Sequence, residues 1–178
     1  MMIRISEPTG GPRTVRREGV YFEQIICRID GELDVCAFRR AWQYAVDHNE
    51  ILRTSFLWEG RAKPVQLVHS DVMIPFQELD WRGLAQLEQE NRLKSLVEAD
   101  RTAGFVLSEP PLSRVTLIRL GRSSYQFIWS NHHALLDGWS QSLIFKQVFT
   151  AYKTLSSGVE LQSEHGMPYR DYIDWLET

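Results

Sequence analysis

The distribution of apolar and polar side chains predicts several short β-strands. The first spans Gly19 to Ile29 and is rich in β-branched and aromatic residues, which favour extended backbone. Further strands are expected, from the same composition or from alternation of apolar and polar positions, at 51–58, 64–69, 76–79, 112–120 and 125–130. Gly60 lies between the second and third strands, and residues 121–124 connect the last two. Such short connections predict antiparallel hairpins.

Apolar residues spaced three to four apart predict four helices. Asp34 is a candidate N-cap for a helix that ends near His48, with an expected buried side of Phe38, Trp42, Ala45 and Val46. A charged helix over about 84–100 is expected to turn inward Leu84, Leu87, Leu93, Leu96 and Val97. A third helix begins after Gly138, with one apolar stripe of Ile144, Val148, Tyr152 and Leu155. A short fourth helix is expected over 169–176.

Helices and strands interleave along the chain, yet several neighbouring strands are joined by short turns. This pattern favours an α/β fold of the α+β sandwich type, with a mixed, largely antiparallel sheet flanked by helices, over a doubly wound parallel sheet. Residues 1–18 contain Gly10-Gly11-Pro12 and no hydrophobic period, so a loose leader is expected there. Residues 19–178 are expected to form one lobe.

The composition is that of an ordinary globular protein, with 43% apolar residues, 24% charged residues and a net charge of −3. This charge gives no electrostatic reason to expect nucleic acid or an anionic membrane as a partner. No apolar run approaches the roughly 20 residues of a membrane span, and the first residues lack the apolar core of a signal peptide. Cys27 and Cys36 lack CxxC spacing, so we expect reduced core thiols in a cytoplasmic protein.

Two adjacent histidines follow the last expected strand, in the stretch from Tyr125 to Trp139. Extended backbone alternates faces, so His132 and His133 are expected to point to opposite sides, and only one of them can face a given channel. From the residues alone, a structural and a chemical role are both open. A zinc site is disfavoured because HExxH is absent, and a serine hydrolase because GxSxG is absent. The chemical alternative is a histidine that acts as a base or positions a bound substrate.

Asp137 and Gly138 form a turn signal before the third expected helix. Asp137 either orients a reacting group or braces the turn by accepting backbone N–H bonds, and the second role is favoured. If it is buried, it requires a cation, for which Arg53 and Arg114 are candidates. Gly138 leaves N–H groups at a helix start unshielded, where they either bind a developing oxyanion or permit the turn. Trp139 is expected to pack.

Residues 132–140, HHALLDGWS, resemble the HHxxxDGWS signature of the condensation domains of nonribosomal peptide synthetases. Two further segments resemble motifs of that family in the same order. Residues 48–56, HNEILRTSF, are similar to RHExLRTxF, and residues 168–176, PYRDYIDWL, are similar to YxDYxxW. The resemblance covers the chain from Gly19 onward. A lone HxxxD is weak evidence, whereas three ordered motifs are specific.

The chain departs from the family pattern in several places. Asp47 stands where the second motif usually has its leading arginine, and Asn49 stands where the family often has Pro or Glu. The first family motif, S/T-x-x-Q, is not recognisable in residues 1–18. The chain ends after the fourth motif. The resemblance therefore implies the N-terminal half of a two-lobe domain with the chloramphenicol-acetyltransferase-like fold, and we expect the C-terminal lobe to be absent.

The resemblance implies an acyltransferase that forms peptide bonds in antibiotic or other secondary metabolite biosynthesis. In this family the acceptor amine attacks the donor thioester, and both are carried on the phosphopantetheine arms of peptidyl carrier protein domains. An adenylation domain of the same synthetase is a further implied partner. The expected catalytic residues are His133 and Gly138, and those with supporting roles are His132, Asp137, Trp139 and Arg53. No bound cofactor or metal is expected, and the chain alone is expected to be inactive without the second lobe.

Two alternative functions remain open. One is a different HHxxxD acyltransferase that uses an acyl-CoA or acyl-carrier donor. The other is a non-catalytic lobe that docks carrier proteins. Epimerisation domains share the double histidine, but the DGWS continuation is closer to condensation domains. Residues 21–24, 52–54 and 168–173 resemble the subtype that accepts a donor ending in a D-residue.

Overall fold

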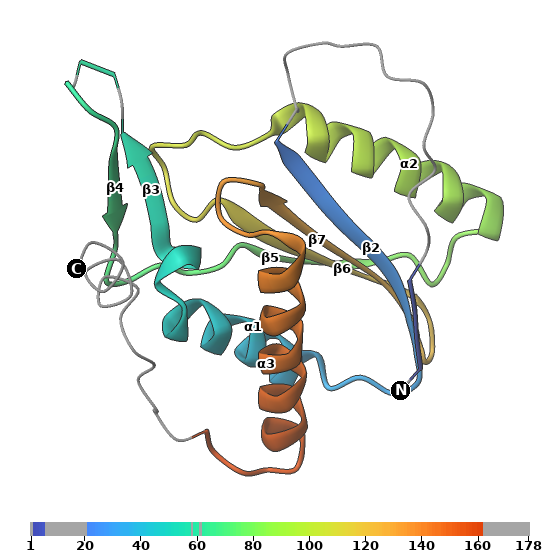
Figure 1. Ribbon diagram of the computed structural model, residues 1–178. Coiled ribbons are helices and arrows are strands. Elements are labelled where there is room, and N and C mark those ends of the chain that lie inside the picture. Colours follow the sequence, from blue (N-terminus) through green and yellow to red (C-terminus); the bar gives the residue numbers. More distant parts are fainter. Residues whose placement is uncertain (1, 6–20, 58, 61, 162–178) are drawn as a thin grey trace. The chain divides into compact units, whose positions relative to one another are not determined.

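The computed structural model describes residues 2–5, 21–57, 59–60 and 62–161 (Figure 1). Their contacts divide into two compact units. We call the first the sheet unit; its described residues lie within Met1–Leu33, Pro75–Phe105 and Ser113–His133. We call the second the helical unit; its described residues lie within Asp34–Ile74, Val106–Leu112 and Ala134–Thr178. That residues 19–178 form a single lobe stays a prediction.

The sheet unit contains a five-stranded sheet in the order β1-β2-β7-β6-β5. The strands are β1 (Met2–Ile5), β2 (Phe22–Asp30), β5 (Phe76–Asp80), β6 (Ser113–Gly121) and β7 (Ser124–His132). All neighbours pair antiparallel except β5 and β6, which are parallel. The expected mixed, largely antiparallel sheet is confirmed.

Strand β1 corrects the expectation of a loose leader over residues 1–18. Met2–Ile5 pair with β2 from Met2↔Asp30 to Ile5↔Cys27, so this part of the leader has regular structure. Four residues give too short an alternation to be recognised without the partner strand that hydrogen-bonds to them. The rest of the expected leader lies outside the described residues.

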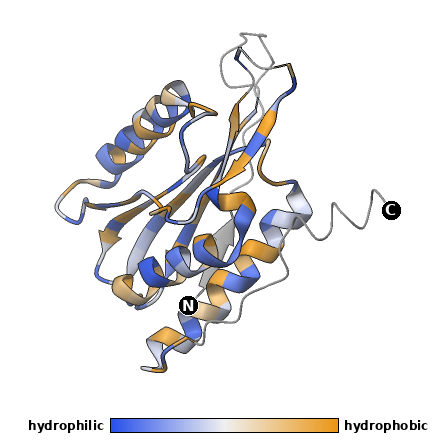
Figure 2. Ribbon diagram, turned by 90° about the vertical axis from the view of Figure 1, so that its left-hand side faces the viewer, coloured by the Kyte–Doolittle hydropathy of each residue, from blue (hydrophilic) through white to orange (hydrophobic). Residues whose placement is uncertain are grey.

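Helix α2 (Gln86–Ala103) covers one face of the sheet (Figure 1). Hydrophobic side chains of the helix, its preceding loop and the sheet pack around a buried cluster of Trp81, Ile118 and Ile128. Four of the five residues expected to point inward pack against this cluster: Leu84, Leu93, Leu96 and Val97. Leu87 was expected there too, but it is 69% exposed because it lies in the first turn, on the solvent side. Figure 2 shows hydrophilic and hydrophobic residues mixed along the helices.

The helical unit contains α1 (Val35–His48), a 3₁₀ turn η1 (Glu50–Arg53), the hairpin of β3 (Thr54–Leu57) and β4 (Val65–Val68), and α3 (Gly138–Ser156). Asp34 caps α1 as predicted, accepting a 3.0 Å hydrogen bond from the Ala37 N–H. The strand expected from residue 51 begins only at Thr54. Residues 50–53 turn helically instead, and the Thr54 hydroxyl bonds back to the Glu50 carbonyl at 2.9 Å.

Aromatic contacts join α1 and α3. The Phe38 ring lies 5.8 Å from Tyr152 and the Trp42 ring 5.9 Å from Phe145, both edge to face. Such pairs contribute about 0.5–1.5 kcal/mol each beyond the area they bury. The whole expected apolar side of α1 is buried, as are Ile144, Val148 and Leu155 of α3. The short helix expected over 169–176 lies outside the described residues.

The two cysteines are free, and their surroundings differ. Cys27 is a core thiol, as expected, and burial raises its pKa to about 11. Cys36 was expected in the core as well, but it is exposed near the start of α1. Within the described part of the chain, no helix is long and apolar enough to cross a membrane.

Candidate active site

His133 directly follows β7, which pairs with β2 on one side and with β6 on the other. The last registered pair of the β2–β7 ladder is Phe22↔His132. One further backbone bond, from the His133 N–H to the Tyr21 carbonyl at 2.6 Å, extends this ladder past the end of the strand. The backbone that carries His133 is therefore fixed by the sheet, which suits a residue that must hold a precise position.

The His133 side chain is exposed and faces a carboxylate. Its Nδ1 atom lies 2.8 Å from the Glu23 Oε1 atom on β2, and the two side chains are 50% and 34% exposed. An ionised carboxylate only accepts hydrogen bonds, so this contact places a proton on Nδ1. In the neutral imidazole, Nε2 is then left as an acceptor.

His132 has different surroundings, as the alternation of faces along an extended chain predicts. It is half-buried, and its ring centroid lies 6.0 Å from that of Tyr21. Burial, and secondarily the neighbouring His133, lower the pKa of His132 below its usual value. The residue is therefore held in the neutral form at neutral pH, consistent with a structural role.

Asp137 caps α3 in the helical unit. Its Oδ1 atom accepts a 2.8 Å hydrogen bond from the Ser140 N–H, and its carbonyl accepts one from the Gln141 N–H at 2.9 Å. The hydrogen bonds from Ser140, first the backbone and then the side chain, lower the pKa of Asp137. The carboxylate is exposed, so it needs no buried cation. This geometry favours a role for Asp137 in holding the turn rigid over a role in orienting a reacting group.

The two arginines considered as partners of Asp137 have other contacts. In the helical unit, Arg53 donates to the carbonyls of Val46, at 3.2 Å, and of His69. It therefore ties the end of α1 to the residue after β4. In the sheet unit, Arg114 pairs with Asp100.

Gly138 and Trp139 are the first two residues of α3, and both are exposed. A Cβ added at Gly138 would meet nothing within 4 Å, and its φ is not in the left-handed region. Neither crowding nor the turn therefore requires glycine there within the described residues. Trp139 was expected to pack, but its side chain is 85% exposed because it points away from the buried face of the helix.

Asp100 organises a polar network in the sheet unit that the sequence did not reveal. Its side chain accepts hydrogen bonds from Gln24 at 2.8 Å, from Ser130 at 2.5 Å and from Arg114. Arg114 also donates to the carbonyls of Asp100 at 2.7 Å and Gly104 at 2.8 Å. This network fixes the C-terminal end of α2 to β2, β6 and β7. Sequence alone could not find it, because the members come from four separate elements.

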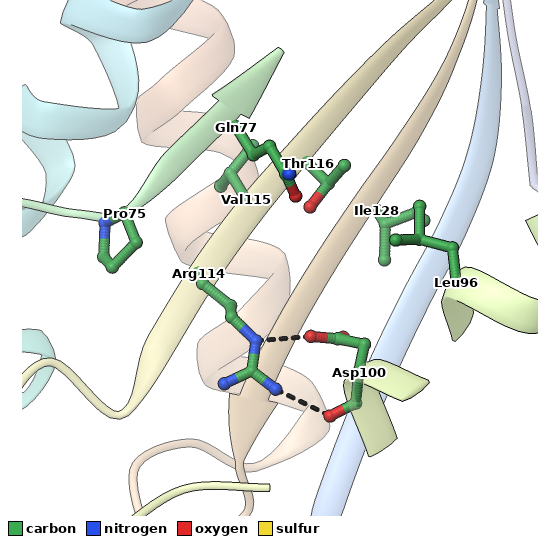
Figure 3. Close-up of a pocket in the computed structure, with 8 residues that line it drawn as sticks. All are labelled: Pro75, Gln77, Leu96, Asp100, Arg114, Val115, Thr116 and Ile128. Carbon is green, nitrogen blue, oxygen red and sulfur yellow. Dashed lines mark hydrogen bonds and ion pairs between the residues drawn. The ribbon is translucent and has the colours of Figure 1, made fainter. Parts of the chain in front are cut away.

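A pocket of about 190 Å³ lies beside this network, between α2 and the sheet (Figure 3). Its lining residues are Pro75, Gln77, Leu96, Asp100, Arg114, Val115, Thr116 and Ile128. Figure 3 shows Asp100 and Arg114 facing each other, joined by the two dashed contacts. The pocket is smaller than the roughly 300–1,000 Å³ of a typical ligand site. Because its charged groups pair with each other, we interpret it as a packing gap.

No group of three or more His, Cys, Asp or Glu side chains that could hold a metal ion occurs among the residues described in the structure. Of the expected site residues, His133 presents an exposed imidazole, His132 lies half-buried beside Tyr21, Asp137 caps α3 and Gly138 begins that helix. The structure adds Glu23, whose carboxylate contacts His133 and which was not among the expected site residues.

The fold and the histidine define a class of protein: an α+β protein that presents an imidazole at the end of a central strand. The family model of the condensation domain matches residues 15–178. The chain therefore belongs to the condensation domain family of nonribosomal peptide synthetases.

Two linear gramicidin synthase polypeptides of Brevibacillus parabrevis are similar to the chain. It is 45% identical to one of them over 159 residues, and 40% identical to the other over 156 residues. These matches cover 89% and 88% of the chain, but only 3% and 2% of the two relatives. The chain thus spans a small fraction of the curated relatives that it matches.

A solved structure shares the fold. The first condensation domain of the calcium-dependent antibiotic synthetase, in complex with a substrate analogue, matches with a TM-score of 0.74 at 24% identity. The match covers 83% of this chain and 35% of that one.

Proposed function

We propose that this chain forms part of a condensation domain that makes peptide bonds between carrier-bound thioesters. Family membership supports the class of reaction. The observation that carries the assignment to a site is the exposed His133 imidazole, held at the end of β7 with its Nδ1 atom against Glu23. The donor and acceptor would arrive on phosphopantetheine arms of two peptidyl carrier protein domains, beside an adenylation domain in the same synthetase.

In the proposed reaction the nitrogen of the acceptor amine attacks the carbonyl carbon of the donor thioester. A C–N bond forms, the C–S bond breaks, and the donor thiol leaves with a proton. The amine nitrogen loses one proton as the amide forms. The Nε2 atom of His133 is suited to accept that proton and to orient the amine lone pair. No metal or bound cofactor is required in this scheme.

Positioning should contribute more than proton abstraction. An α-amine titrates near 7.7–8.0 in model compounds, so generating the free amine at neutral pH costs only about 1 kcal/mol. A general base contributes about 3–5 kcal/mol, whereas entropic positioning contributes roughly 7–11 kcal/mol. His133 is therefore proposed chiefly as the group that holds the amine in line with the thioester.

The other site residues have lesser proposed roles. Gly138 keeps the start of α3 free of a side chain, which would let a substrate approach the first N–H groups of the helix. Asp137 holds that helix start rigid through its bond to Ser140. We expect the 178 residues alone to show no condensation, because the reaction would require the second lobe of the domain.

The experiment is His133→Ala in the complete two-lobe domain, supplied with a preformed donor on its carrier protein and, in separate assays, a carrier-bound acceptor and a small soluble amine. We expect a loss of at least about 10²–10⁴-fold in amide formation, the share that proton transfer alone contributes. His132→Asn is the matched control, since it removes the neighbouring imidazole from the same strand end. If His133→Ala retains the wild-type rate with carrier-bound and soluble amines alike, the proposed function of this site is wrong.

A parallel assay separates condensation from the two alternatives. The complete domain should use a donor on a carrier protein in preference to the same acyl group on CoA. A preference for CoA would indicate a different acyltransferase. Carrier binding without product in either assay would indicate a docking lobe.

A further inference from the structure

We propose that Glu23 is a positioning residue for His133, fixing its ring orientation and tautomer so that Nε2 is directed to the substrate as the acceptor. This inference rests on the proposed function, in which His133 orients the acceptor amine. It assigns a role to a residue on a different strand, within residues 21–24, whose resemblance to a subtype of the family gave Glu23 no role in the chemistry.

The register of the sheet brings Glu23 and His133 together. Glu23 is the partner of Asn131 in the β2–β7 ladder, and His133 lies two residues beyond Asn131. Residues two apart on a strand share a face, so Glu23 and His133 are diagonal neighbours on one face of the sheet. The backbone bond from His133 to Tyr21 fixes their relative position, because Tyr21 is two residues from Glu23 along the chain.

Asn131, the residue directly opposite Glu23, does not compete for this carboxylate. Its side chain is fully buried, and neither its amide nitrogen nor its amide oxygen has a hydrogen-bond partner in the described part of the chain. The carboxylate instead approaches Nδ1 of His133 at 2.8 Å, a normal length for a charge-assisted hydrogen bond.

The contact with Glu23 decides which ring nitrogen of His133 carries the proton. A neutral imidazole has one N–H and one lone pair, and the hydrogen bond made by one nitrogen decides the role of the other. The Glu23 carboxylate has no proton to donate, so it selects the tautomer with the proton on Nδ1. Nε2 then has its lone pair available, which is the state that a group accepting a proton from an amine requires.

A purely structural ion pair is the competing explanation, and exposure argues against it. The two side chains are 50% and 34% exposed, and exposed pairs of that kind contribute little to folding. The same contact has a large effect on chemistry if it fixes the ring. In the analogous case of metal-ligating histidines, loss of the group that orients the ring typically costs 10–100-fold in activity or metal affinity.

The kinetic test uses the complete domain with Glu23→Ala, Glu23→Gln and Glu23→Asp. We expect Glu23→Ala to lower kcat about 10–100-fold and to change KM for a soluble amine by less than threefold. Glu23→Gln should retain part of the activity, because its amide oxygen still accepts from Nδ1 while its NH₂ group also permits the other tautomer. Glu23→Asp retains the carboxylate and should therefore retain more activity than Glu23→Gln. Glu88→Ala is the matched control, since it removes a similarly exposed ion pair, with Arg92, from α2.

A spectroscopic test needs no turnover. In the 178-residue chain, long-range ¹H–¹⁵N correlation of the histidine rings at a pH where imidazole is neutral should show His133 with its proton on Nδ1. Glu23→Ala should move that resonance pattern towards a mixture, whereas Glu88→Ala should leave it unchanged.

The outcomes separate the two proposals. If His133→Ala abolishes activity while Glu23→Ala is as active as Glu88→Ala, Glu23 is not a positioning residue but the proposed function stands. If the tautomer of His133 is the same with and without Glu23, the inference is overturned whatever the activity. If His133→Ala is fully active, the proposed function fails, and the tautomer measurement still decides what Glu23 does to the ring.

Discussion

Two pairs that carboxylates form in the sheet unit, one with an arginine and one with a histidine, differ in nearly every physical respect. Asp100 and Arg114 join α2 to β6, with side chains 18% and 24% exposed, and Asp100 also accepts from two further side chains. Glu23 and His133 join β2 to the end of β7, with side chains 34% and 50% exposed, through one ring nitrogen. In the first pair the Asp100 carboxylate is surrounded by donors from within the sheet unit, Arg114, Gln24 and Ser130. In the second pair the other ring nitrogen is left for a further partner.

The difference indicates where each pair exerts its effect. A partly buried ion pair is costly to break, because removal of one member leaves the other charge desolvated. An exposed pair has solvent as a substitute partner and contributes little to folding. The Asp100 pair should therefore matter for stability, and the Glu23 pair should matter for chemistry.

The largest expected effect on stability is that of Asp100→Asn. The substitution keeps the shape of the side chain but leaves the Arg114 guanidinium without its countercharge. We expect the free energy of unfolding to fall by about 2–4 kcal/mol, somewhat below the 3–5 kcal/mol typical of a fully buried pair. Urea denaturation followed by circular dichroism measures it.

A second substitution sharpens this prediction. Adding Arg114→Met to Asp100→Asn removes the uncompensated cation, and we expect part of the lost stability to return. Glu88→Gln, which breaks the exposed pair with Arg92, is the control and should change stability by less than about 0.5 kcal/mol. If Asp100→Asn is no more destabilising than this control, the Asp100–Arg114 pair does not support the fold more than an exposed pair does.

The next effect concerns the pH dependence at the histidine end of β7. Burial, and then the charge of His133, lower the folded-state pKa of His132 below its unfolded value. The unfolded chain therefore takes up the proton more readily, so the contribution of His132 to stability is complete above about pH 6.5 and is lost as the pH falls below it.

We expect His132→Asn to reduce the loss of stability between pH 7 and pH 5 relative to the wild-type chain. Denaturant unfolding at pH 8, where both proteins lack a charge at this position, provides the baseline for the comparison. Identical slopes of unfolding free energy against pH in the two proteins would show that His132 is not linked to folding.

Local patterns in the sequence predicted much of this fold. The Asp34 cap, the hairpin of β3 and β4 and the strand pair of β6 and β7 depend on residues close together in the chain, and the structure confirms them. Strand periodicity likewise gave the two histidines different surroundings. The errors at Leu87 and Trp139 have a shared cause, since each apolar residue lies in the first turn of a helix, where solvent is accessible.

The parts of the site that were missed depend on contacts between distant segments. Glu23 meets His133 only because β2 pairs with β7, and Asp100 meets Arg114 only because α2 packs on the sheet. Asp100 lies in no motif that the sequence revealed, and the resemblance of residues 21–24 gave Glu23 no contact. A sequence pattern does not report which strands become neighbours. Two signals pointed to Glu23: it belongs to residues 21–24, which resemble a subtype of the family, and it alternates with Tyr21 on a predicted strand.

The smallest expected change in stability is that of Glu23→Gln, and it completes the comparison. The glutamine oxygen can still accept from Nδ1 of His133, and water can replace any contact that is lost at side chains 34% and 50% exposed. We therefore expect the unfolding free energy to stay within about 0.5 kcal/mol of the wild-type value, measured beside Asp100→Asn in the same denaturant series. A loss as large as that of Asp100→Asn would mean that the Glu23 pair also supports the fold, and a fall in activity could then not be assigned to the ring of His133. Unchanged stability with reduced turnover would locate the contribution of Glu23 at the His133 imidazole, where the proposed function places the chemistry.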